Sequence, residues 1–105
     1  MKFYKKLYMS EYYKDHLNKT GKVIKKIRRR DMVNNAYIIT LREKGGLMDI
    51  IYAPRLYNKY YPADELYIIG IAEDYESAAY LAGKIALDAY EATGSYDVYH
   101  FIKEA

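Results

Sequence analysis

The chain has 105 residues, of which 51% are apolar, and contains no cysteine, no tryptophan, 2 prolines and 15 tyrosines. This length suits one compact domain, which we expect over residues 1–105. The absence of cysteine excludes disulfide frameworks, thiolate metal sites and thiol nucleophiles. Only His16 and His100, with Ser10, Ser77 and Ser95, remain for base or nucleophile chemistry. The composition therefore favours a non-enzymatic protein, and we expect no cofactor and no metal.

The N-terminus interleaves charged and apolar residues, whereas a signal peptide needs a continuous apolar stretch of about 7–15 residues. The longest strongly apolar run, residues 66–72, is far shorter than the roughly 20 residues that span a bilayer. These patterns predict a soluble cytoplasmic protein without a membrane partner.

Charge is unevenly distributed along the chain. The net charge is +3, but residues 1–34 hold eleven Lys or Arg and three acidic residues, a balance of +8, which leaves −5 for residues 35–105. We therefore distinguish a basic N-terminal segment (1–34) from an α/β body (35–105). The basic residues concentrate at Lys22, Lys25, Lys26, Arg28, Arg29 and Arg30. Nucleic-acid binding is possible there. We favour a solvated helix face, or docking on the acidic body of the same or a neighbouring subunit.

The first half of the chain reads as strand, helix and hairpin. Residues 3–9 favour a strand, and Thr20 is placed to cap a helix with Val23, Ile24 and Ile27 on its apolar side. Residues 35–41 and 47–52 are apolar runs of strand composition. Residues 42–46 between them suit the turn of an antiparallel hairpin.

The second half predicts a crossover and a strand-helix-strand unit. Pro54 suits the first turn of a short helix that ends at Pro62. Residues 66–72 indicate a central strand buried on both faces. Residues 75–92 follow as a helix capped by Asp74 and ended by Gly94, with small residues toward the sheet. We predict a final edge strand at 96–102, parallel to the central one. The small residues are Ala79, Gly83 and Ala86.

This order predicts the α/β class, namely a single small domain with a mixed β-sheet of four or five strands and helices packed on it. An α+β sandwich is the alternative. Four segments also resemble a group of small bacterial proteins of about 105 residues and unknown function. They are Met48-Asp49-Ile50-Ile51, Tyr60-Tyr61-Pro62, residues 66–72 and residues 90–98. The resemblance covers roughly residues 35–102. It implies a small α/β domain and no particular activity.

Ligands of open α/β sheets usually bind beyond the carboxyl ends of the strands, and this rule selects one candidate cleft. We expect a small polar ligand or a substrate there as an alternative function. The candidate residues are Asn35, Tyr52, Arg55, Glu73, Asp74, Tyr75 and His100. The acidic residues after the central strand disfavour phosphate. Asp49 interrupts an apolar strand and is expected to pair with Arg42, Arg55 or Lys44.

The tyrosines are too numerous to fill the core of so small a domain, because each hydroxyl needs water or a polar partner. Tyrosine is favoured at protein interfaces, where the ring is buried and the hydroxyl stays wet. Together with the exposed edge strand predicted at 96–102, the excess favours a homo-oligomeric interaction module as the leading hypothesis.

Overall fold

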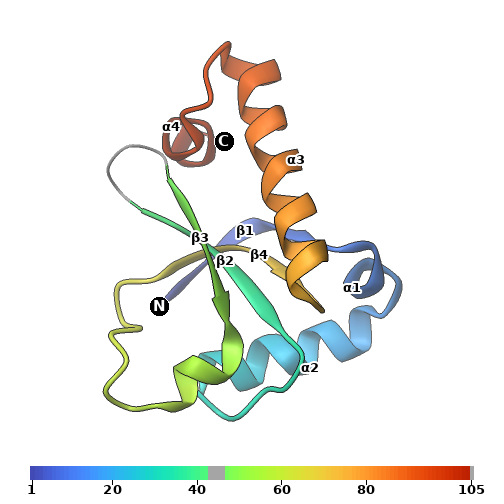
Figure 1. Ribbon diagram of the computed structural model, residues 1–105, viewed down its shortest axis with the longest axis vertical. Coiled ribbons are helices and arrows are strands. Elements are labelled where there is room, and N and C mark those ends of the chain that lie inside the picture. Colours follow the sequence, from blue (N-terminus) through green and yellow to red (C-terminus); the bar gives the residue numbers. More distant parts are fainter. Residues whose placement is uncertain (43–46, 105) are drawn as a thin grey trace.

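The computed structural model describes residues 1–42 and 47–104 and shows a small α/β domain, which confirms the predicted class. A four-stranded mixed sheet runs through the molecule, with helices packed on it (Figure 1). In chain order the elements are β1 (Lys2–Met9), α1 (Glu11–Asp15), α2 (Leu17–Arg28), β2 (Tyr37–Leu41), β3 (Met48–Tyr52), the 3-10 helix η1 (Ala53–Tyr57), β4 (Tyr67–Ala72), α3 (Tyr75–Thr93) and α4 (Val98–Glu104).

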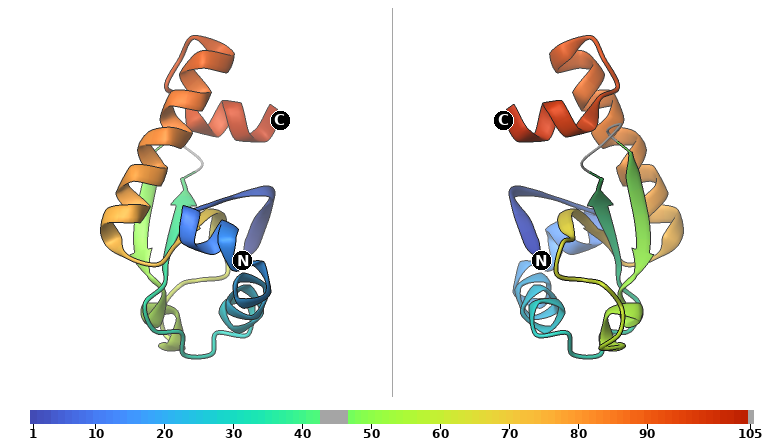
Figure 2. Two further views of the ribbon diagram at one scale, coloured as in Figure 1. Left: turned by 90° about the vertical axis from the view of Figure 1, so that its right-hand side faces the viewer. Right: turned by 90° about the vertical axis from the view of Figure 1, so that its left-hand side faces the viewer.

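The strand order is β1-β4-β2-β3. β1 runs parallel to β4, and β2 runs antiparallel to both β4 and β3. β4 is therefore central, as predicted, but its parallel partner is β1 and not residues 96–102. The basic segment 1–34 supplies that strand, so it is part of the same fold as residues 35–105. β1 and β3 lie at opposite margins of the sheet (Figure 2).

Each face of the sheet has its own core. Ile38, Ile51 and Ile68 pack with Ile27 of α2 on one face. On the other face, Ile39 and Ile69 belong to the cluster that includes Leu81 and Ile85 of α3 together with Val98 and Ile102 of α4. The helices that follow β1 and β4 thus cover opposite faces of the sheet.

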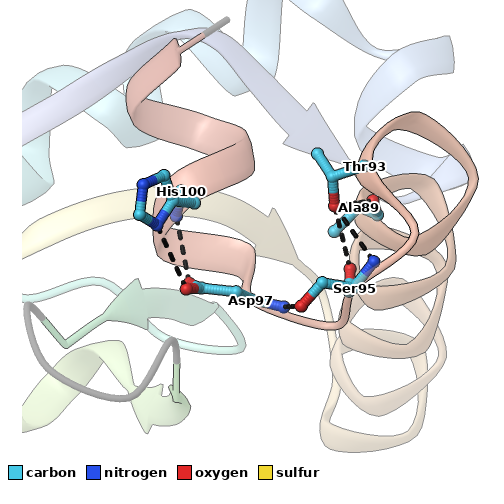
Figure 3. Close-up of polar contacts among 5 residues, drawn as sticks. All are labelled: Ala89, Thr93, Ser95, Asp97 and His100. Atoms are coloured by element: carbon cyan, nitrogen blue, oxygen red, sulfur yellow. Dashed lines mark hydrogen bonds and ion pairs between the residues drawn. The ribbon is translucent and has the colours of Figure 1, made fainter.

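The strand predicted at 96–102 is wrong, because residues 98–104 form α4. Asp97 caps this helix: its Oδ1 accepts a hydrogen bond from the backbone N–H of His100 at 3.1 Å (Figure 3). Val98 and Ile102, four residues apart, are the buried pair of α4 and pack against the α3 side of the sheet. The segment has the composition of a strand, but the Asp97 cap and the helical spacing of the two buried residues favour a helix.

Two helix predictions also need correction. α2 begins at Leu17, and Thr20 lies buried within it, where its hydroxyl donates to the carbonyl of Tyr13 at 2.8 Å. On α3, the residues buried against the sheet are Ala78, Leu81, Ile85 and Ala89. Of the small residues predicted to face the sheet, Ala79 and Gly83 are exposed and Ala86 is half-buried. They lie on the outer and flanking sides of the helix.

The other local predictions agree more closely with the structure. Asp74 caps α3 by accepting a 2.7 Å hydrogen bond from the N–H of Ser77, and Gly94 ends it with a φ of +76°. Pro54 occupies the first turn of η1, although this helix ends at Tyr57, well before Pro62. The predicted hairpin strands are β2 and β3. Residues 43–46 of their predicted turn, including Lys44, lie outside the described residues.

Candidate functional site

Part of the predicted cleft forms at the carboxyl ends of β3 and β4. Tyr52 ends β3 and Tyr75 begins α3, and the ring of Tyr37 connects them. The ring centroids of Tyr37 and Tyr52 are 5.0 Å apart, and those of Tyr37 and Tyr75 are 6.0 Å apart. Tyr37 was not among the predicted cleft residues. Its position at the start of the strand paired with β3 could have identified it.

Asn35 and Arg55 lie near this end of the sheet but do not complete a cleft. Asn35 is exposed in the turn before β2, with a φ of +58° that asparagine tolerates better than most residues. Arg55 is exposed on η1. Neither side chain forms part of the tyrosine cluster.

His100 does not join the predicted cleft. It lies on α4, where its Nδ1 is 3.2 Å from Oδ2 of Asp97. The adjacent turn of α4 places Lys103 Nζ 4.5 Å from the ring centroid of Tyr67, the first residue of β4. Glu73 and Asp74 follow the last residue of the same strand. His100 and the two carboxylates therefore belong to opposite ends of β4, and the predicted seven-residue cleft does not form.

A hollow of about 590 Å³ does occur at the carboxyl ends of the parallel pair β1 and β4. Because α1 and α2 cover one face after β1 and α3 covers the other after β4, this is the switch point at which open α/β sheets usually bind ligands. Of the predicted cleft residues, Glu73 and Asp74 line this hollow. The lining residues are Met9, Ser10, Glu11, Tyr12, Lys14, Glu73, Asp74, Glu76, Ser77, Tyr80, Leu81 and Lys84.

Carboxylates outnumber ammonium groups in this hollow. Oε1 of Glu73 is buried and lacks a hydrogen-bond partner among the described residues. Burial and then the charge of Glu73 raise the pKa of Tyr13. The hydrogen bond from the Ser77 N–H lowers the pKa of Asp74. The hollow thus suits hydrogen-bond donors more than phosphate. The described residues contain no group of His, Cys, Asp or Glu arranged to hold a metal.

The three arginines of the basic run are engaged within the chain. The Arg28 guanidinium lies 4.5 Å from the ring centroid of Phe3, and Arg29 pairs with Asp31 at 3.1 Å. Arg30 donates hydrogen bonds of 2.9, 2.7 and 2.8 Å to the carbonyls of Leu56, Asn58 and Tyr61. These contacts give Arg30 a structural role. Lys22, Lys25 and Lys26 are exposed.

The outer edge of β3 is the other notable surface. Ala53 N–H donates to Ala36 O, and Arg42 N–H donates to Leu47 O, each at 2.9 Å. Hydrogen-bonded and non-hydrogen-bonded residue pairs alternate along an antiparallel ladder, so these two bonds show which pairs of β2 and β3 exchange backbone hydrogen bonds. The backbone groups of Met48, Ile50 and Tyr52 therefore point away from β2, toward the side where β3 has no neighbouring strand among the described residues.

Comparisons with known proteins give no guide to function: no family model matches the chain, and neither a curated protein nor a solved structure similar to it was found. The resemblance to small bacterial proteins stays a prediction. Within the described part of the chain, no helix is long and apolar enough to cross a membrane.

Proposed function

We propose that the protein is a non-enzymatic interaction module of a bacterial cytoplasm, and that it assembles with copies of itself along the edge of β3. The observation that carries this proposal is the character of that edge. Its pairing with β2 is regular, and the strand contains neither lysine nor proline. Unpaired edges of this kind recruit further strands through their backbone groups.

A second copy of the chain fits this edge in antiparallel orientation, with the two-fold axis at Ile50. Met48 of each copy then faces Tyr52 of the other, and the outward backbone groups of each pair exchange hydrogen bonds. Methionine sulfur and an aromatic ring form a favourable contact. Asp49 faces Ile51, so no like charges oppose each other. Asp49 is also neutralised within its own chain by Arg42, one of the three partners predicted for it, at 2.7 Å.

The flank of α3 extends the same surface. Asp88 accepts a hydrogen bond from Tyr8 of β1, whereas Tyr75 contacts Tyr37 on the other side. Helical spacing then puts Ala82, Ala86 and Ala79 on the flank nearer β3, whereas Gly83 faces outward. A stable interface buries roughly 1,200–2,000 Å² in total, more than a short strand edge supplies. We therefore include this flank, where small residues allow a second helix to approach closely. Its residues are Ala79, Ala82 and Ala86.

Exchanging one tyrosine for lysine tests the edge. Sedimentation equilibrium of the full chain at micromolar concentration should give twice the monomer mass of 12.4 kDa. Tyr52→Lys puts a charge into the strand pairing and should raise the dimer dissociation constant at least about 10-fold, equivalent to about 1.4 kcal/mol. Tyr60→Lys is the matched control, because its ring is 82% exposed on the loop after η1. This control should leave the dimer intact.

A second variant separates assembly from folding. Ala79 is exposed on α3, on the flank toward β3. Ala79→Lys should therefore change the free energy of unfolding of the monomer by less than about 0.5 kcal/mol, while it weakens the dimer. A monomeric wild-type protein at all concentrations would contradict the proposal. So would equal effects of Tyr52→Lys and Tyr60→Lys on the dimer.

A further inference from the structure

Exposed lysines gather on a side of the molecule that lies away from the β3 edge. They lie on β1 and α2, two elements that meet where Arg28 stacks on Phe3. Figure 2 shows α2 on the β1 side of the sheet in both views. We call five of these residues the β1–α2 surface: Lys5, Lys6, Lys22, Lys25 and Lys26.

The lysines of the β1–α2 surface are not neutralised by the acidic residues of the chain. Among the described residues, the basic side chains that pair with a carboxylate are Lys14, Arg29, Arg42, Lys84 and His100. The docking of the basic segment on the acidic body of the same chain, which the charge distribution favoured, is therefore not found in the described residues. The lysines of this surface are exposed and form no ion pair with a carboxylate of the described residues.

The spacing of these charges on α2 suits a row of phosphates. Lys25 and Lys26 lie three and four residues after Lys22, so they project from the next turn of the same helix side, about 5–6 Å from Lys22. Lys22 and Lys26 span about 6 Å along the helix axis. Phosphates on one strand of duplex DNA rise about 3.4 Å each, so about two of them match the α2 lysines, and those of β1 extend the contact.

A membrane surface fits these residues less well. Helices that bind in a bilayer interface insert an apolar face. On α2 the apolar residues Val23, Ile24 and Ile27 pack in the core of the protein instead. Readout of a base sequence is also disfavoured, because arginine is the usual reader of guanine and the arginines at 28–30 are engaged within the chain.

We propose that the β1–α2 surface binds nucleic acid through its phosphate backbone, without reading the base sequence. The charge, the spacing and the exposure of the lysines support this assignment. It does not depend on self-assembly, because Tyr52→Lys alters the β3 edge and leaves the lysines of the β1–α2 surface in place.

The salt dependence of binding tests this proposal on the full chain. Fluorescence anisotropy with a labelled 20-base-pair DNA duplex, and with the matching RNA duplex, gives the dissociation constant as a function of salt. Three to four neutralised phosphates predict a log–log slope of about −3, so affinity should fall about 40- to 150-fold between 50 and 200 mM salt. The DNA and RNA arms identify which nucleic acid binds more tightly.

Two triple variants decide whether the surface or the net charge is responsible. Lys22→Gln, Lys25→Gln and Lys26→Gln together should remove most of the affinity and about two or more units of slope. Replacing the same three lysines with Arg should preserve both. The control changes Lys59, Lys84 and Lys103 to Gln, which lowers net charge equally on other surfaces. Equal loss in this control would overturn the proposal, as would equally tight binding to phosphatidylserine vesicles or polyglutamate, or strong selectivity between duplex sequences.

Discussion

β1 and β3 form the two edges of one sheet, yet they differ in charge and in regularity. β1 carries Lys2, Lys5 and Lys6, and its register with β4 shifts between Phe3 and Tyr8. β3 pairs with β2 without a shift, and its single charged residue is paired with Arg42. Lysines and irregular pairing are the usual means by which proteins block an unpaired edge. The contrast indicates that β1 is protected against strand pairing and β3 is open to it.

The largest expected effect comes from removing the protection of β1. Lys5→Thr with Lys6→Thr replaces two exposed charges on the edge strand by β-branched residues. We expect particles larger than a dimer, because a second pairing edge allows open-ended assembly. Light scattering against concentration measures this. The control Lys25→Thr with Lys26→Thr removes the same charge from α2, which offers no strand edge, and should not form such particles.

Arg30 connects α2 to the segment after β3, since it extends from the residues after α2 to the carbonyl of Leu56 in η1 and those of Asn58 and Tyr61 beyond it. Arg30→Lys keeps the charge but loses the planar fork that reaches three acceptors. We expect a loss of about 1–2 kcal/mol in the free energy of unfolding, measured by urea denaturation. Arg29→Lys is the matched control and should change stability by less than about 0.5 kcal/mol. Equal effects of the two substitutions would contradict the role given to Arg30.

The smallest expected effect on stability comes from removing the hydroxyl of Tyr8, which connects β1 to α3. Its hydroxyl donates to Asp88 at 2.8 Å, so Tyr8→Phe should cost about 1 kcal/mol of stability near neutral pH. Burial first, and then Asp88, raise the pKa of Tyr8 above its ordinary value near 10. This contribution is therefore present below about pH 10 and is lost as the pH rises further.

The pH dependence of the free energy of unfolding tests the contribution of Tyr8 directly. Above about pH 10 the unfolded chain releases the Tyr8 proton while the folded chain retains it, so wild-type stability should fall more steeply than that of Tyr8→Phe. Urea denaturation at successive pH values shows the difference. Tyr60→Phe, which removes an exposed hydroxyl, should follow the wild-type profile. Parallel profiles for wild type and Tyr8→Phe would show that β1 is not held through this hydroxyl.

Much of the local structure was predictable from short-range patterns. The apolar run at 66–72 identified the central strand, because a strand buried on both faces has no polar alternation. Asp74 and Gly94 marked the ends of α3, because a cap and a left-handed residue act on the backbone of their immediate neighbours. Arg42, one of the three partners predicted for Asp49, pairs with it because it follows the strand that lies beside Asp49 in the hairpin.

The sequence by itself therefore determined the α/β class, the central strand and the cap-bounded long helix, since each rests on the chemistry of residues close together in the chain. The tertiary structure decided which strand lies beside β4, and thus which edges of the sheet remain free. Residues 96–102 have the composition of a strand, but burial of Val98 and Ile102 against the α3 side of the sheet makes them a helix and leaves the place beside β4 to β1. Pairing between distant segments depends on which apolar faces can be buried together, and no local pattern contains that information.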